Sequence, residues 1–135
     1  MKKKTKGFTL IELTISLFVI ALGLLGMLMA NSTIQRMSES AHEEMLAVQD
    51  AERLVELMRN ASAAGNFPTN VTAVYPNGYS APVFSAGLVN GTLAVSYVNP
   101  SADPLDVTVT TSWRKLGVRN TSLQLRTLMT QRRTS

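Results

Sequence analysis

The stretch Lys6-Gly7-Phe8-Thr9-Leu10-Ile11-Glu12-Leu13 opens an apolar run of 23 residues, from Phe8 to Ala30, in which Glu12 is the only charged residue. A helix rises ~1.5 Å per residue, so this run is long enough to cross the ~30 Å hydrocarbon core of a bilayer. A carboxylate inside such a segment costs about 2.5 to 3.5 kcal/mol on insertion scales, and it is usually paired. We therefore predict a membrane-inserted helix whose single carboxylate has a partner.

The sequence GFTLIEL at residues 7–13, preceded by a short lysine-rich leader, resembles the class III signal peptide of type IV pilins and of the pseudopilins of type II secretion. The resemblance implies that prepilin peptidase, a membrane enzyme, cleaves between Gly7 and Phe8 and methylates the new amine of Phe8. It further implies that Glu12 neutralises the N-terminal amine of a neighbouring subunit during filament assembly. This amine would be the partner that the carboxylate needs.

Elementary electrostatics support the same pairing. An α-amino group has an ordinary pKa near ~8 and is cationic, and an amine at Phe8 lies one helical turn from the Glu12 carboxylate. Between subunits in an apolar bundle, such a pair favours one axial stagger, because an unpaired charge in low dielectric is costly. A second interpretation stays open, in which Glu12 is an ordinary helix-end carboxylate that reaches the cytoplasmic interface.

A conventional secretory signal is the competing interpretation, because Lys2, Lys3, Lys4 and Lys6 precede the apolar run. The run is longer than the usual core of about 7 to 15 residues, and its best cleavage site, Leu28-Met29-Ala30, has leucine where a small residue is required. The lysines orient the N-terminus toward the cytoplasm. We expect a single-pass protein of the bacterial inner membrane before assembly, and an extracytoplasmic filament or cell-surface location afterwards.

Charge is distributed unevenly along the 135 residues. Four of the 13 basic residues lie in the leader, so the basic isoelectric point does not by itself indicate a nucleic-acid-binding protein. Residues 8–60 hold seven acidic and three basic side chains, whereas residues 61–135 hold two and six. The chain has no cysteine, so its exported part cannot be closed by the disulfide found in many pilins, which favours a minor pilin or pseudopilin.

Residues 31–60 predict an amphipathic continuation of the apolar helix. Apolar side chains recur there every three or four residues, at Ile34, Met37, Ala41, Met45, Val48, Ala51, Val55 and Met58. Leu54 and Leu57 widen this face, and we expect a C-terminal sheet to cover residues 34–58. Within the apolar run, Gly23 and Gly26 mark a site where the helix could loosen when it leaves lipid.

The C-terminal half predicts a small antiparallel sheet. Segments 93–98, 107–113 and 123–129 alternate in polarity and are rich in β-branched and aromatic residues, and turn residues separate them. Their inward face would contain Leu93, Val95, Tyr97, Val107, Val109, Leu123 and Leu125. The predicted fold is α+β and pilin-like. Its regions are a leader at 1–7, a transmembrane and assembly helix at 8–30, an amphipathic helix at 31–60, a variable connecting loop at 61–92 and an antiparallel β-sheet head at 93–135.

The sequence contains no arrangement that predicts an enzyme or a cofactor site. His42 is the only histidine and lies among polar residues, and no nucleophile is paired with it. The acidic residues of the helix scatter around its polar face and do not predict a metal site. A nucleic-acid contact through Arg114, Lys115 and Arg119 is the weaker hypothesis, because only Trp113 is near them for stacking.

We therefore expect a structural filament subunit, a minor pilin or a minor pseudopilin. Its expected partners are other pilins or pseudopilins through the N-terminal helix, prepilin peptidase, the inner-membrane assembly platform, and membrane lipid before assembly. Three filaments stay open: a pilus, a type II secretion pseudopilus, and a competence pilus with a DNA-binding subunit. A membrane-anchored extracytoplasmic domain unrelated to filaments is the remaining alternative.

Overall fold

The computed structural model describes residues 9–63 and 65–131. Its elements, in chain order, are α1 (Leu10–Ser62), α2 (Thr69–Val74), β1 (Ser80–Pro82), β2 (Thr92–Tyr97), β3 (Leu105–Lys115) and β4 (Arg119–Met129). The contacts divide the chain into two compact units, one ending at Ser38 and the other beginning at Glu39. The α+β fold predicted above, a long N-terminal helix and a C-terminal antiparallel sheet, is confirmed.

The boundaries of α1 follow from local chemistry. Thr9 lies just before the helix, and its hydroxyl accepts a hydrogen bond from the Glu12 N–H at 3.4 Å, which satisfies one of the free N–H groups of the first turn. No proline occurs before Pro68, so nothing interrupts the helical ladder. At the other end Gly65 and Asn66 have φ angles of 88° and 53°, the left-handed conformation that terminates helices.

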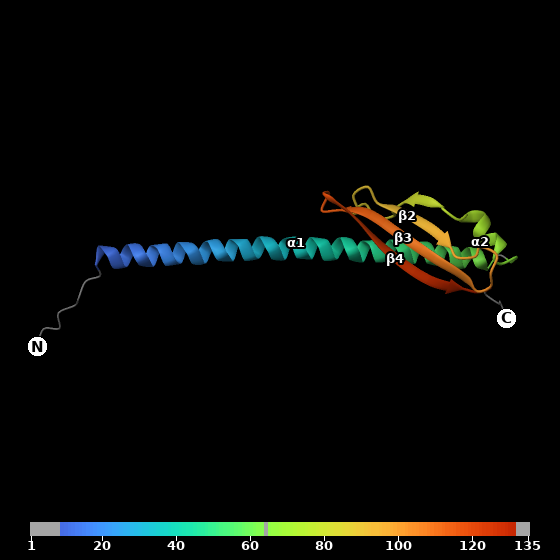
Figure 1. Ribbon diagram of the computed structural model, residues 1–135, viewed down its shortest axis with the longest axis horizontal. Coiled ribbons are helices and arrows are strands. Elements are labelled where there is room, and N and C mark those ends of the chain that lie inside the picture. The colour runs from blue at the N-terminus through green and yellow to red at the C-terminus, as the bar shows by residue number, and fades with distance from the viewer. Residues whose placement is uncertain (1–8, 64, 132–135) are drawn as a thin grey trace, which may run out of the picture. The chain divides into compact units, whose positions relative to one another are not determined.

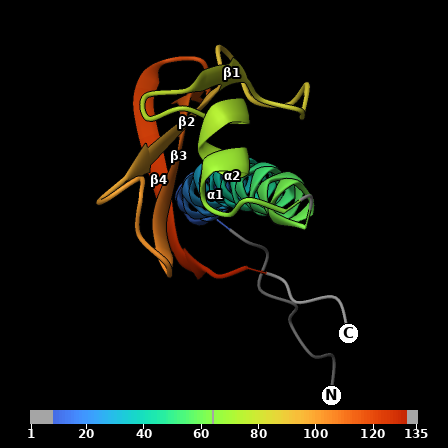
Figure 2. The same cartoon turned by 90° about the vertical axis from the view of Figure 1, so that its right-hand side faces the viewer.

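The second unit is built around a four-stranded antiparallel sheet in the order β1-β2-β3-β4 (Figure 2). Strands β2, β3 and β4 lie along the C-terminal part of α1 (Figure 1). Alternation places every second side chain of β3 in the core, with Leu105, Val107 and Val109 fully buried. From α1 the core receives Ala51, Leu54, Val55 and Met58, and α2 contributes Val71.

The strands are longer than the polarity pattern predicted. β3 and β4 each extend over eleven residues and pair from Leu105↔Met129 to Lys115↔Arg119. Only Leu116, Gly117 and Val118 are left for the turn. The added residues near the turn are charged or polar, so a criterion based on apolar alternation ends the strands too early. Of the seven side chains predicted to face inward, the five on β2 and β3 are buried, and Leu123 and Leu125 on β4 are half-buried.

The prediction that the sheet covers residues 34–58 was wrong in its first part. Burial on α1 begins at Ala47, whereas Ile34, Met37 and Met45 are 64%, 68% and 51% exposed. Leu57 is also 40% exposed. The physical reason is the reach of the sheet, because the β3–β4 hairpin ends where it bonds to the carboxylates of residues 43 and 44. In the region predicted as a connecting loop, residues 61–92, the structure has α2 and β1.

Candidate functional site: the exposed apolar helix and its carboxylate

The N-terminal part of α1 presents apolar side chains on every side. From Leu10 to Met29 each large hydrophobic side chain is at least half exposed, and an eighteen-residue window that is long and apolar enough to span a membrane contains no buried residue. A soluble helix would show one apolar stripe and one polar face. A helix that is apolar all round suits contact with lipid, or with other helices, on all its faces.

Glu12 lies in the first turn of α1, next to a helix cap that the sequence reading missed. Thr9 and Glu12 have the Thr-x-x-Glu spacing of a capping box, in which the threonine hydroxyl bonds to the N–H of the glutamate. The Thr9 carbonyl also accepts from the Glu12 N–H at 3.1 Å. A carboxylate at this position is favoured by the helix dipole as well. Glu12 is exposed, and no ion pair to it is present among residues 9–63 and 65–131.

Gly7 and Phe8, the predicted cleavage and methylation residues, lie outside the described residues. Gly23 and Gly26 lie inside α1, which continues through both of them without a break. A Cβ atom added at either glycine would meet no heavy atom within 4 Å. The predicted loosening at these glycines stays a prediction, and their substitution would create no clash inside the chain.

The three basic residues considered for nucleic-acid contact have different surroundings. Lys115 pairs with the carboxylate of Glu44 on α1, whereas Arg114 and Arg119 are exposed. Trp113 is only 3% exposed, and its Nε1–H donates to Glu43 at 3.2 Å. The tryptophan therefore belongs to the core of the second unit and does not offer a free ring face for stacking on bases.

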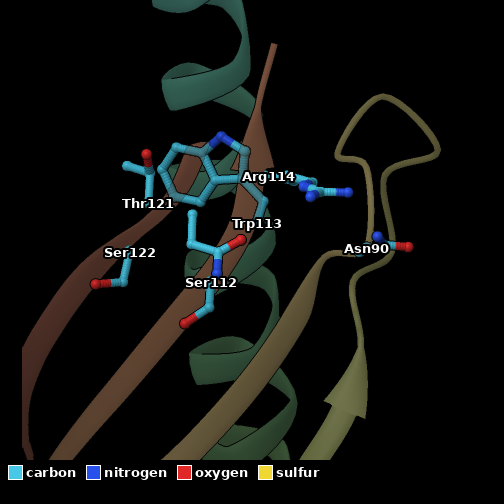
Figure 3. Close-up of a pocket in the computed structure, with 7 residues that line it drawn as sticks. Asn90, Ser112, Trp113, Arg114, Thr121 and Ser122 are labelled. Carbon is cyan, nitrogen blue, oxygen red and sulfur yellow. The ribbon is translucent and has the colours of Figure 1, made fainter. Parts of the chain in front are cut away.

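A shallow hollow of about 450 Å³ lies beside Arg114 (Figure 3). Its lining is mostly hydroxyl and amide side chains, from Asn90, Ser112, Asn120, Thr121 and Ser122, together with Trp113 and Arg114. None of these lining residues is a carboxylate or a histidine. The hollow thus has hydrogen-bonding groups and one cation but no pair suited to general acid–base chemistry.

Two acidic residues of α1 that the sequence reading placed on the polar face hold the second unit together. Asp50 is 3% exposed and accepts from the Ser85 N–H at 3.0 Å and from the Ser85 hydroxyl at 2.7 Å. Glu43 accepts from the Trp113 ring and from the Leu116 N–H, the latter at 3.0 Å. No spacing rule on the helix identifies these residues, because their partners are more than 30 residues away in sequence.

Comparison with protein families identifies the start of the chain. Residues 2–28 match the prokaryotic N-terminal methylation motif. This motif is the class III signal peptide of type IV pilins and pseudopilins, so the resemblance drawn from the sequence is confirmed. The motif implies processing by prepilin peptidase and assembly with other pilins, and with the exposed apolar helix it supports an inner-membrane-anchored precursor. Comparisons with curated proteins and with solved structures find no match.

Proposed function

We propose that this chain is a structural subunit, a minor pilin or a minor pseudopilin, of a type IV pilus-like filament. The observation that carries the proposal is the coincidence of two features in one segment. The methylation motif at residues 2–28 overlaps the part of α1 whose apolar side chains are exposed on every side. In this proposal the chain is processed between Gly7 and Phe8, and the exposed apolar surface provides the contact on which assembly depends.

The proposed mechanism is transfer of the helix from lipid to protein. In the membrane, lipid tails cover the apolar side chains of residues 10–29, and in the filament the helices of neighbouring subunits replace the lipid. Prepilin peptidase first exposes the Phe8 amine, and the Glu12 carboxylate of one subunit pairs with the amine of another. Because either charge is costly when it is unpaired in an apolar bundle, the pair selects one stagger between neighbours. The role is structural and involves no catalysis by this chain.

Processing is tested by mass spectrometry of the N-terminal peptide from protein recovered in its native cells. An N-methylated Phe8 at the first position is the expected result. An intact Met1, or a mature chain that starts near Asn31, would contradict the proposal and favour an anchored or a secreted domain. A catalytically dead prepilin peptidase in the same cells is the control, because it should leave Met1 in place.

The charge of Glu12 is tested by a pair of variants that separates its two roles. Glutamine also suits this position of a capping box, so Glu12→Gln removes the charge alone, whereas Glu12→Ala removes the charge together with any cap made by the side chain. If the charge sets the stagger, both variants are inserted in the membrane, and both enter filaments poorly. If the residue only caps α1, Glu12→Gln assembles normally and Glu12→Ala does not. Filament yield relative to the membrane-bound pool is the measurement.

No observation favours the DNA-binding form of the proposal. Of the three cations considered, Lys115 is engaged by Glu44, and the neighbouring Trp113 ring is buried. A receptor for DNA would require binding that weakens steeply with salt and fails when Arg114 and Arg119 are reversed to glutamate. The choice between a pilus and a secretion pseudopilus depends on which subunits co-purify with the methylated chain.

A further inference from the structure

The two edges of the sheet differ in how open they are to another strand. β1 has three residues, ends in Pro82 and therefore presents a short edge in which one residue has no N–H group. β4 has eleven residues and contains neither proline nor glycine. Natural sheets usually protect long edges, because a row of unpaired main-chain groups attracts other strands. The long edge of β4 is therefore a site to which another strand could add.

The hydrogen bonds of β3 identify which groups of β4 face outward. The Asp106 carbonyl accepts from Val98, and the Arg114 N–H donates to Val89, so even-numbered residues of β3 face β2. Odd-numbered residues of β3 consequently bond to the odd-numbered residues opposite them on β4. The N–H and C=O groups of Ser122, Gln124, Arg126 and Leu128 then point to the free edge. Within the described ranges, no hydrogen bond is made to these groups.

A groove runs along this edge, with α1 as its other wall. One hollow of about 580 Å³ is lined by β4 residues 125–127 and by α1 side chains from Gln49 to Arg59. A second hollow of about 410 Å³ is lined by residues 128–130 and by Glu56, Arg59 and Ser62. The two hollows share Glu56 and Arg59 in their linings, so they lie next to each other along this edge and are called the groove below. Figures 1 and 2 show β4 as the outermost strand next to α1.

Among the described residues, the ion pairs along the groove leave one carboxylate, that of Glu52, without a partner. Arg126 donates through Nε to Asp106 at 2.9 Å, and this bond lowers the pKa of the Asp106 carboxyl. The Arg59 Nη1 atom lies 3.6 Å from the Glu56 Oε2 atom and forms an ion pair with it. The Arg53 guanidinium lies 4.6 Å from the centre of the Phe84 ring.

Glu52 is exposed and has no ion pair in the described part of the chain. The same wall contains Val55, and the half-buried Leu125 lies across from it on β4. The groove thus combines an apolar floor with one unpaired acid.

We propose that this groove binds an extended segment of another protein, which adds to β4 as a fifth strand. Its main chain would bond to the outward groups of Ser122, Gln124, Arg126 and Leu128. Side chains two apart in a strand share a face, so the segment would place an apolar side chain over Val55 and Leu125 and a basic side chain, two residues away, opposite Glu52. The proposal is independent of Glu12 and of the kind of filament.

A second copy of this chain fits the groove poorly. The edge that it could offer at β1 is short and contains Pro82. If it offered its own β4, the odd-numbered side chains would lie on the face toward the helix, and the only charged one among them is Arg119, at the first position of the strand. The side chain two positions from Arg119 on that face is Thr121, so a second β4 does not place a basic and an apolar side chain two residues apart. A segment with a lysine or an arginine is the better complement.

The test uses the full chain, labelled with ¹⁵N in detergent micelles, and a synthetic peptide. The probe has seven residues of alternating threonine and valine, with lysine at the sixth position in place of valine. We expect it to shift the amide signals of Ser122, Gln124, Arg126 and Leu128 and to slow their hydrogen exchange. Replacing the lysine by glutamate should weaken binding by roughly fivefold, and Glu52→Lys should reverse this preference.

Substitutions at one edge residue provide the matched control. Gln124→Pro removes an outward N–H without breaking a bond to β3 and should abolish binding, whereas Gln124→Ala should leave it unchanged. If Gln124→Pro lowers the unfolding midpoint, the wild-type protein is tested instead with a peptide in which every second amide is N-methylated. This peptide should not bind.

Three results would overturn the proposal. In the first, the peptide leaves the signals of the four edge amides unchanged. In the second, the lysine and glutamate peptides bind with equal affinity. In the third, hydrogen exchange of the edge amides slows as the protein concentration is raised in the absence of peptide. The last would show that a second copy occupies the edge.

Discussion

Asp50 illustrates how a single charged side chain can hold a long loop. It is almost fully buried on α1, and both its carboxylate oxygens are occupied by Ser85, whose loop precedes β2. In Asp50→Ala the Ser85 N–H and hydroxyl lose their acceptor, so the free energy of unfolding should fall by about 2 to 3 kcal/mol. Urea unfolding of the two proteins measures the difference. Glu52→Ala, an exposed acid on the same helix, should change it by less than about 0.5 kcal/mol.

The buried hydroxyl of Tyr97 leads us to expect that the free energy of unfolding falls at high pH. Its hydroxyl donates to the Tyr75 carbonyl at 2.6 Å, and burial raises the pKa of Tyr97 to about 12. A phenol has an ordinary pKa of about 10, so the folded state holds this proton more tightly than the unfolded state does. The stabilisation is complete below about pH 10 and is lost as the pH rises through about 12. Unfolding midpoints between pH 9 and pH 12 should fall more steeply in the wild type than in Tyr97→Phe.

At the scale of residues, sequence patterns identified what local chemistry determines. The prediction of GFTLIEL as a processing motif needed only adjacent residues, and the family match confirmed it. The roles of Asp50 and Glu43 could not be predicted, because both looked like solvated acids on a helix. Only the fold brings Ser85 to the first and the Trp113 ring to the second. A polar side chain is expected to be buried only when its hydrogen-bond partner is known, and a sequence pattern does not identify a partner that is distant along the chain.

The β3–β4 hairpin depends on two adjacent glutamates of α1 that act differently. Glu43 is half-buried and bonds to the Trp113 ring and to Leu116, a turn residue with a φ of 49°. Glu44 is exposed and forms one ion pair with Lys115. Glu43→Ala should cost about 1 to 3 kcal/mol, because a buried indole N–H loses its acceptor, whereas Glu44→Ala should cost less than about 1 kcal/mol. Equal losses in urea unfolding would contradict this division.

Element boundaries were predicted well where the signal is intrinsic to the segment. The amphipathic helix was expected to end at residue 60, and α1 ends at Ser62 because residues 65 and 66 adopt the left-handed conformation. The strands were predicted too short, since Lys115, Arg119 and Asn120 pair across the hairpin without being apolar. The short helix α2 was not predicted. Its six residues include one fully buried side chain, Val71, and a single apolar position has no periodicity to detect.

For the whole molecule, the sequence predicted an α+β fold but not where the sheet stops along the helix. The apolar stripe continues from Ile34 to Met58 with one periodicity, although only the residues from Ala47 onward are buried. The same apolar side chain is favourable under a sheet of its own chain and against a neighbouring protein or lipid. Periodicity therefore identifies the face of a helix that is to be covered, and the length of the β3–β4 hairpin decides how much of it this chain covers itself.

The limit of burial along α1 leads to a prediction about the second unit. Every buried side chain of the described residues lies between Ala47 and Met129, and the contacts of Glu43 and Glu44 lie within the same unit. A fragment of residues 39–135 should therefore be soluble without detergent and unfold cooperatively, with a midpoint within a few degrees of that of the full chain in micelles. A fragment of residues 48–135 is the matched control. It lacks both glutamates and Ala47, whose carbonyl accepts from the buried Thr111 hydroxyl, so it should lose at least about 2 kcal/mol. Thermal unfolding followed by circular dichroism measures the full chain and both fragments. If the fragment of residues 39–135 showed no cooperative transition, the sheet would require the apolar half of α1 to fold.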